Sequence, residues 1–464
     1  MLTGALQSRS FSGRTSTARV LTAPQSSRHL IPDILCFAIP FSSAWNVKFI
    51  GELPLGEIMV LFLLPICLIN YNKRIWTPLN RSIYIMMGFW LLGQVVSDLY
   101  RHSKFTNAAK GVAGIIFFAL DLIVLTTIIN YKPRRILMFA LGVAPMHMII
   151  YLFSPSGWGG EQADVVWKTT WGPFVNTTTL LVCCYMTRLK RYNVVMLLIT
   201  ALIAINLLEN FRSAALILTL TLVLSVPLPD TLQQKKVDYK GRRPFDTRIL
   251  IMVLLGSIGM TALAMTYSYT ASMGMLGDVA QSKYESQSRG KFGVLIGGRP
   301  ETLVSLKAIA ENPFIGHGSW AEDPKYSQML LDELWENGYA MDQADLPRLI
   351  EGSFLIPTHS HIFGAWVWAG ILGAAFWIFF LIFVARGFSA LIRVRPWLAP
   401  YMAYTLSLAL WDVFFSPFAS YRRITVSLLV VIVLYLLTED KKQTEILRLK
   451  FMKTYRKTIS VVFQ

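Results

Sequence analysis

The chain has 464 residues, of which 54% are hydrophobic and only 15% charged, and its mean hydropathy is +0.48. A soluble domain carries about 25% charged residues, so this composition excludes a water-soluble globular protein and predicts a polytopic membrane protein. The net charge of +17 does not indicate nucleic acid, because no nucleic-acid-binding motif is present and most of the excess falls in short loops, where it sets topology.

Residues 1–31 are rich in Ser and Arg, and no acidic residue precedes Asp33. The region has no apolar core of the signal-peptide type, so it is interpreted as a cytoplasmic tail, with an organellar transit peptide as the alternative. The four cysteines all lie in apolar segments, which predicts buried thiols rather than disulfides or a zinc site; they are Cys36, Cys67, Cys183 and Cys184.

Twelve apolar segments follow the tail, and they predict an all-α polytopic membrane protein with about 12 transmembrane helices. Helices 1–9 are expected within 32–270, a large extracytoplasmic loop at 271–359, helices 10–12 within 360–438 and a cytoplasmic tail at 439–464. The segments lie near 32–50, 54–70, 82–98, 111–129, 135–153, 173–187, 192–208, 211–227, 248–270, 360–385, 398–416 and 422–438.

An even number of spans places both termini on the same side of the membrane. Of the 44 Lys and Arg residues, 29 then fall on that side, which the positive-inside rule assigns to the cytoplasm. The long loop has 12 acidic and 7 basic residues between 271 and 358, and this net negative charge suits the outer face.

Several ionisable residues lie within or beside the apolar segments, where charge is costly and is usually kept for function. Arg212 opens the eighth segment and could clamp an anion, but it could also snorkel or pair with Glu209. Asp121 is interpreted as a partner in a helix–helix hydrogen bond. Asp412 is expected to pair with Arg422 or Arg423.

The outer loop at 98–110 is basic, which runs against the topology rule. It carries Arg101, Lys104 and Lys110. An anionic substrate at the outer surface would explain this charge, and simple tolerance of one exceptional loop is the alternative.

The long loop contains the residues best suited to chemistry. The stretch 300–311 and the stretch 325–337 have the spacing of short amphipathic helices. His359 stands at the entry to the tenth apolar segment, where a histidine can take a proton from a hydroxyl near neutral pH. His361 and His317 are further candidates. A three-histidine metal site is an alternative, but no HExxH or HxxxH pattern supports it, so no metal is expected.

Two arginines of the loop could bind a phosphate group. Arg299 follows two glycines in GGRP, which would let the backbone approach a bulky anion while the guanidinium makes a bidentate contact. Arg289 in QSRGKF is a comparable candidate.

Three stretches together resemble the superfamily of bacterial O-antigen ligases and O-antigen (exopolysaccharide) polymerases. GGRPETLVSLKAIAENPFIGHG is similar to the family's loop pattern of Gly-Arg, amphipathic helix, Pro and Gly-x-Gly. THSHIFGAWVWAGILG is similar to its His-Asn segment followed by Gly-x-x-Gly, here His359 with Gly370 and Gly373. NFRSAALIL is similar to the Ser-Arg-Gly segment of an earlier span, which gives Arg212. Ser360 replaces the usual Asn, and the residues before Arg212 also differ.

The resemblance implies a GT-C-like, metal-independent glycosyltransferase without a cofactor, in the bacterial cell inner membrane. Its partners would be an undecaprenyl-diphosphate-linked oligosaccharide donor and a glycan or lipid A-core acceptor. His359 would be the catalytic base, and Arg212 and Arg299 would bind the donor diphosphate, with Arg289, His361, His317 and Arg101 as secondary candidates. The enzyme could be a repeat-unit polymerase or a glycan ligase. A flippase for the same lipid-linked oligosaccharide is the alternative, although the sequence shows no internal repeat.

Overall fold

The computed structural model describes residues 27–48, 51–153, 166–226, 247–288, 299, 301–336 and 354–462. The described chain is almost entirely helical. Its elements before the long loop are α1 (Ser27–Ser42), β1 (Asn46–Lys48), β2 (Glu52–Pro54), α2 (Leu55–Ile75), α3 (Pro78–Arg101), α4 (Phe105–Ile129), α5 (Pro133–Phe153), the π-helical turn η2 (Trp167–Trp171), α7 (Gly172–Arg188), α8 (Tyr192–Leu208), α9 (Arg212–Ser225) and α10 (Thr247–Ser272).

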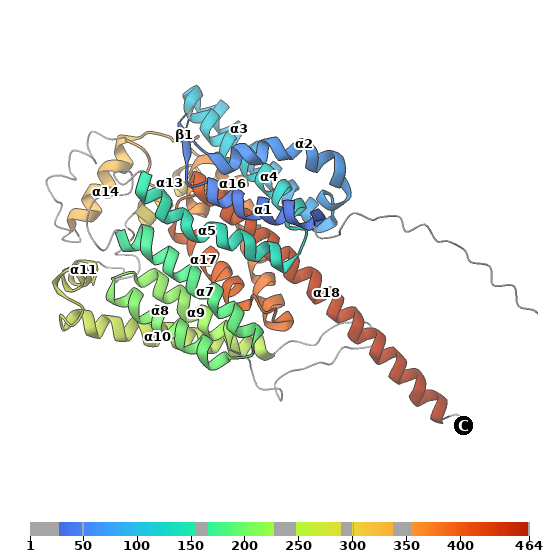
Figure 1. The fold of residues 1–464 in the computed structure, drawn as a ribbon. Helices are drawn as coiled ribbons and strands as arrows, with labels where there is room; N and C mark the ends of the chain where they lie inside the picture. Colours follow the sequence, from blue (N-terminus) through green and yellow to red (C-terminus); the bar gives the residue numbers. More distant parts are fainter. Residues whose placement is uncertain are drawn as a thin grey trace, which may run out of the picture.

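The long loop carries three described helices, and three long helices follow it. The loop helices are α11 (Asp278–Ser288), α13 (Glu301–Glu311) and α14 (Pro324–Glu336), and the last three are α16 (His361–Val394), α17 (Ala399–Phe415) and α18 (Ser420–Val462). Figure 1 shows α11, α13 and α14 at one end of the molecule, with the C-terminus of α18 at the other. The expected helices at 300–311 and 325–337 are confirmed within one residue at each end.

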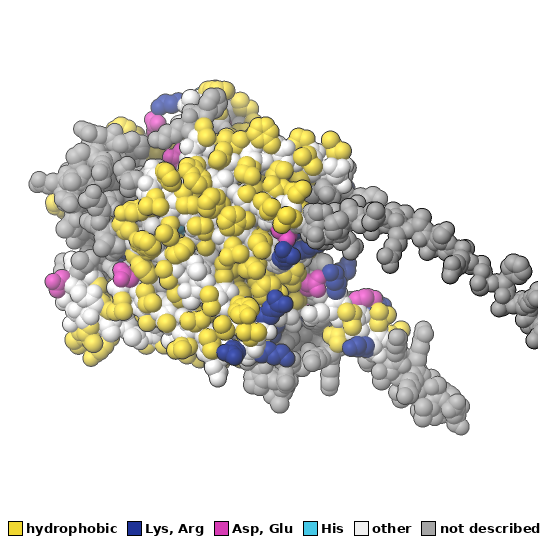
Figure 2. Space-filling view, in the orientation of Figure 1, with side chains coloured by type: hydrophobic (Ala, Val, Ile, Leu, Met, Phe, Trp, Pro, Cys, Tyr) yellow, Lys and Arg dark blue, Asp and Glu magenta, His cyan; other side chains and the backbone are white. Residues whose placement is uncertain are grey.

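Each of the twelve predicted apolar segments contains a helix, as expected of a predominantly α-helical membrane protein. In the described residues, six helices are long and apolar enough to cross a membrane, and four more apolar helices are shorter. The body exposes many large apolar side chains, among them Phe62 (78%), Ile69 (81%) and Leu197 (69%). Figure 2 shows a broad hydrophobic surface over the helices. Such a surface is stable in lipid and not in water.

Some predicted boundaries were wrong. The first apolar segment, predicted at 32–50, leaves the helix at Ser42 and continues into the antiparallel pair β1–β2, in which Asn46 pairs with Pro54. The predicted C-terminal tail at 439–464 is helical as far as Val462, because α18 runs unbroken into it.

Helix α16 lies at the centre, packed against α3, α17, α18 and α13. An aromatic cluster fills the space between these helices. Trp90 and Phe376 stack with 5.0 Å between ring centroids, and Trp377 meets Phe418 edge-on at 5.3 Å. This rigid apolar core fixes the N-terminal end of α16, where the candidate site lies.

A buried ion pair ties α2 to α18. Both carboxylate oxygens of Glu57 accept hydrogen bonds of 2.6 Å from the guanidinium of Arg423, and Glu57 is fully buried. Asp121 of α4 is also fully buried, but neither of its carboxylate oxygens has a hydrogen-bond partner in the described structure. The predicted helix–helix hydrogen bond of Asp121 was therefore wrong, and the guanidinium of Arg423 donates its hydrogen bonds to Glu57 instead.

Candidate active site

The site begins where the chain enters α16. Ser360 is the N-cap of this helix: its Oγ accepts a hydrogen bond of 3.1 Å from the backbone N–H of Phe363 and donates one of 2.7 Å to the carbonyl of Val413 in α17. The hydroxyl of Ser360 thus both caps α16 and fixes it to α17. His359 is the residue immediately before this cap, beside the positive end of the helix dipole.

Helix α13 brings the second part of the site to His359. Ser305, which is fully buried, donates a hydrogen bond of 2.8 Å from Oγ to the carbonyl of Pro357, two residues before His359. Glu301 lies one turn earlier on α13, and Arg299 comes just before the helix. The loop helix is therefore fastened directly beside the entry to α16, with its N-terminal end towards His359.

The charges of these residues act on the imidazole of His359. Burial lowers the pKa of His359 below its usual 6.5, and the positive charge of Arg299 lowers it further. The carboxylate of Glu301 opposes this shift, and Arg422 adds a smaller lowering. His359 is therefore neutral at physiological pH, which is the state that can accept a proton.

Arg422 reaches the site from the first turn of α18. Its guanidinium forms an ion pair with Asp412 of α17, and its Nε donates a hydrogen bond of 3.2 Å to the hydroxyl of Tyr421. The predicted pairing of Asp412 is thus confirmed, with Arg422 as the partner. The Arg422 side chain as a whole is 20% exposed.

The Gly-x-Gly motif of the long loop (Gly316 and Gly318) contacts the Gly-x-x-Gly motif of α16 (Gly370 and Gly373) at a break in the helix. Gly370 has a φ of +65° and a ψ of −156°, which interrupts the helix and frees backbone groups on both sides. The loop segment 314–318 occupies the break: the N–H groups of His317 and Gly318 donate to the carbonyls of Val367 (2.7 Å) and Trp368 (3.2 Å), and the N–H of Ile371 donates to the carbonyl of Phe314 (3.2 Å). The loop thus completes the hydrogen bonding of the broken helix.

The basic stretch at 98–110, where α3 ends and α4 begins, contacts this same segment. Arg101 donates from Nε to the carbonyl of Gly316 (2.9 Å) and from Nη2 to the side chain of Asn312. Asp98 accepts from the backbone N–H of Ser319 (2.6 Å) and from its Oγ (2.7 Å). The attachment of the long loop by Arg101 was not among the two explanations proposed for the positive charge, which were binding of an anionic substrate and simple tolerance. Arg101 fixes the long loop rather than standing free for an anion.

Two of the secondary histidine candidates have structural contacts. His317 lies 2.9 Å by its Nε2 from the carbonyl of Ala308 in α13, and its ring meets Tyr326 edge-on. His361 is buried, with its ring 4.8 Å from that of Trp377. Among the described residues, no three His, Cys, Asp or Glu side chains form a group that could hold a metal, so the alternative three-histidine site is not assembled.

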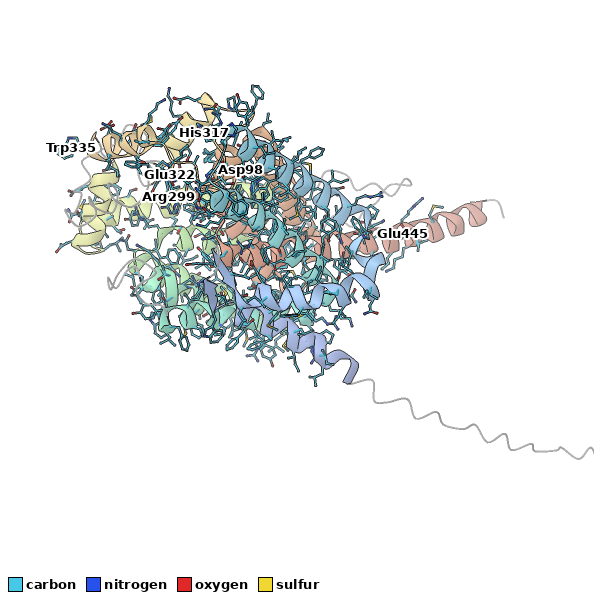
Figure 3. The ribbon with its side chains drawn as sticks, turned by 90° about the horizontal axis from the view of Figure 1, so that it is seen from above. Asp98, Arg299, His317, Glu322, Trp335 and Glu445 are labelled. Carbon is cyan, nitrogen blue, oxygen red and sulfur yellow. The ribbon has the colours of Figure 1, made fainter. Side chains whose placement is uncertain are left out.

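The predicted arginines divide into two groups. Arg299 lies beside His359, whereas Arg212 begins α9 and places its guanidinium over the ring of Tyr267 in α10, 5.0 Å from the ring centroid. Arg212 is not among the charges that shift the pKa of His359. Arg289 lies outside the described residues. Figure 3 shows Arg299, Asp98 and His317 at the end of the molecule opposite Glu445.

No family model matches this chain, and no curated protein matches it significantly. The geometry at the entry to α16 is therefore the basis for a functional interpretation. There the charges of Arg299, Arg422 and Glu301 act on a neutral histidine. Sequence reasoning missed Glu301 and the role of Arg422. The position of Glu301 two residues after Arg299 in GGRPE was a usable signal, but nothing in the local sequence links Arg422 to His359.

Proposed function

We propose that this chain transfers a glycan from a polyprenyl diphosphate to an acceptor hydroxyl at the outer face of the bacterial inner membrane. The observation that carries the proposal is the neutral His359, on which the positive charges of Arg299 and Arg422 act, at the entry to α16 where the loop helix α13 is fastened. The resemblance of the loop and α16 motifs to O-antigen ligases and polymerases supports the same reaction. The twelve apolar helices would then be the spans of a GT-C-like enzyme.

In the proposed reaction, the unprotonated nitrogen of His359 takes the proton of the acceptor hydroxyl. The acceptor oxygen attacks the anomeric carbon of the donor sugar, and the bond from that carbon to the diphosphate oxygen breaks. The lipid diphosphate leaves with the additional negative charge. Arg299 and Arg422 stabilise that charge, and Glu301 stabilises the imidazolium that His359 has become. Binding of the donor diphosphate by Arg212 remains a prediction from the sequence.

The test is an assay of the purified protein with a synthetic polyprenyl-diphosphate oligosaccharide, with and without lipid A-core. A ladder of products identifies a polymerase, and a single addition that needs lipid A-core identifies a ligase. Full activity is expected in EDTA, because no step uses a metal. Absence of transfer under every acceptor condition would reject the proposal.

A flippase for the same lipid-linked oligosaccharide is the second candidate. The buried pair Glu57–Arg423, with the unpartnered carboxylate of Asp121 close enough to interact with both, favours it, because buried charges are common in transporters. Movement of a fluorescent donor across vesicle membranes, without any change in its glycan, would identify the flippase.

A further inference from the structure

The C-terminal part of α18 extends beyond the packed body of the protein. Asp440 is fastened to the body: Arg393 of α16 donates to its carboxylate from Nε (3.0 Å) and from Nη2 (2.8 Å). The 22 residues after Asp440 continue the helix to Val462, a length of about 33 Å. Figure 1 shows this part of α18 pointing away from the other helices.

The exposed surface of this projecting helix is partly apolar. Ile446 is 52% exposed, Leu449 is 55% exposed and Met452 is 38% exposed. These residues are three apart, so they follow one another along one side of the helix. Exposure of large apolar side chains to water is energetically unfavourable. Their presence on a helix that leaves the body therefore indicates a surface that is covered in the cell.

The charge of residues 446–462 distinguishes between the kinds of partner that could cover this surface. Between Ile446 and Val462 the sequence has five basic residues and no acidic residue. A second copy of the helix alongside the first would bring ten like charges together, which opposes pairing. Nucleic acid would accept the charge but offers no apolar phase for Ile446 and Leu449. A basic helix with exposed apolar residues fits an anionic lipid surface, because the headgroups attract the basic side chains and the acyl chains accept the apolar ones.

The helix is also suited to bend towards a membrane. Its anchor at Asp440 contacts Arg393, in the last turn of α16, so the projecting part leaves the body where α16 ends. Thr438 and Thr444 flank the anchor, and each donates from Oγ1 to the carbonyl four residues earlier, at 2.7 Å. This kind of hydrogen bond often bends helices.

We propose that residues 441–462 form a basic membrane-surface helix that binds anionic lipid headgroups where α18 leaves the body of the protein. Ile446, Leu449 and Met452 enter the boundary between headgroups and acyl chains, and the basic residues contact the lipid phosphates. This role is independent of glycan transfer, because it uses the end of the molecule opposite His359.

The test uses the full-length protein with an environment-sensitive fluorophore on Met452→Cys, reconstituted in phosphatidylcholine vesicles with or without phosphatidylglycerol. The four native cysteines are buried, so the label reports on the new thiol. A blue shift of the fluorescence is expected with phosphatidylglycerol and not without it, and raised salt should reverse the shift. An equal spectrum in both vesicles would overturn the proposal.

Charge variants provide the second arm of this experiment. Reversal of Arg448, Lys453 and Lys457 to Glu should lower the ratio of bound to free helix by roughly fivefold or more per residue. The matched control keeps the charge, with Arg448→Lys, Lys453→Arg and Lys457→Arg, and should bind as the parent does. If the charge-reversed variant bound the vesicles as well as the parent does, an electrostatic contact with lipid would be contradicted. Energy transfer between the labelled 441–462 segments of two molecules, with or without anionic lipid, would show that a second copy of the helix covers this surface instead.

Discussion

The backbone N–H of His317 donates a hydrogen bond of 2.7 Å to the carbonyl oxygen of Val367, and this contact joins the long loop to the break in α16. The break exists because Gly370 adopts a backbone conformation that other residues rarely reach. The loop segment supplies the hydrogen bonds that the interrupted helix lacks. The position of α13, and with it Arg299 and Glu301, therefore depends on a glycine inside an apolar helix.

Gly370→Ala should dislodge the loop. An alanine Cβ would lie 2.0 Å from the carbonyl oxygen of Phe314, and the φ of +65° adds about 1–3 kcal/mol of conformational strain. We expect faster amide hydrogen exchange across 314–318 and a strong loss of glycan transfer. Gly114→Ala is the control, because the added methyl group would meet no atom within 4 Å other than those of its own stretch of helix. Normal exchange protection in Gly370→Ala would show that the loop does not need the break.

Arg101→Ala should loosen the same segment from the other side. It removes the charge-assisted hydrogen bonds to Asn312 and Gly316, each of which contributes about 1.5–3 kcal/mol at most. Transfer should fall but persist, and exchange should rise near Gly316. Lys104→Ala is the control, since its ion pair with Glu322 is exposed and contributes little. If Arg101→Ala abolished donor binding with unchanged loop exchange, Arg101 would instead be a substrate ligand.

The acid limb of the pH–rate profile should report on His359. Because the pKa of His359 is lowered, activity should be retained below pH 6.5 and fall only as protonation removes the base. Arg299→Gln removes a charge that lowers this pKa, so the limb should move to higher pH. Glu301→Gln removes a charge that raises it, so the limb should move to lower pH. Parallel shifts in both variants would exclude these residues as the electrostatic neighbours of the base.

The pair Glu57–Arg423 should show the behaviour of a buried ion pair. Glu57→Gln leaves the guanidinium of Arg423 without a counter-charge and should destabilise the protein by about 3–5 kcal/mol. The double variant Glu57→Leu with Arg423→Met should be less damaging than Glu57→Gln, because both charges are absent. Thermal unfolding in detergent measures this order. A double variant less stable than the single one would indicate that the charges have another role.

The helices were predictable from apolar runs, because each run is long enough to identify a buried or lipid-facing helix. The break at Gly370 was not, since glycine is common in membrane helices and its φ follows from the loop that packs against it. The resemblance of the loop and α16 motifs predicted a shared site for Arg299 and His359. Arg422 could not be found in this way, because its approach depends on how α17 and α18 pack.

The central claim is that His359 is the base for glycan transfer. The most direct measurement is the rate of transfer from a synthetic polyprenyl-diphosphate oligosaccharide by His359→Gln, compared with the exposed-histidine control His102→Asn. A general base contributes roughly 10²–10⁴-fold, so His359→Gln should lose at least about a hundredfold in rate, with helical content and donor binding retained, and His102→Asn should match the parent. Transfer by His359→Gln at the parental rate would contradict the account.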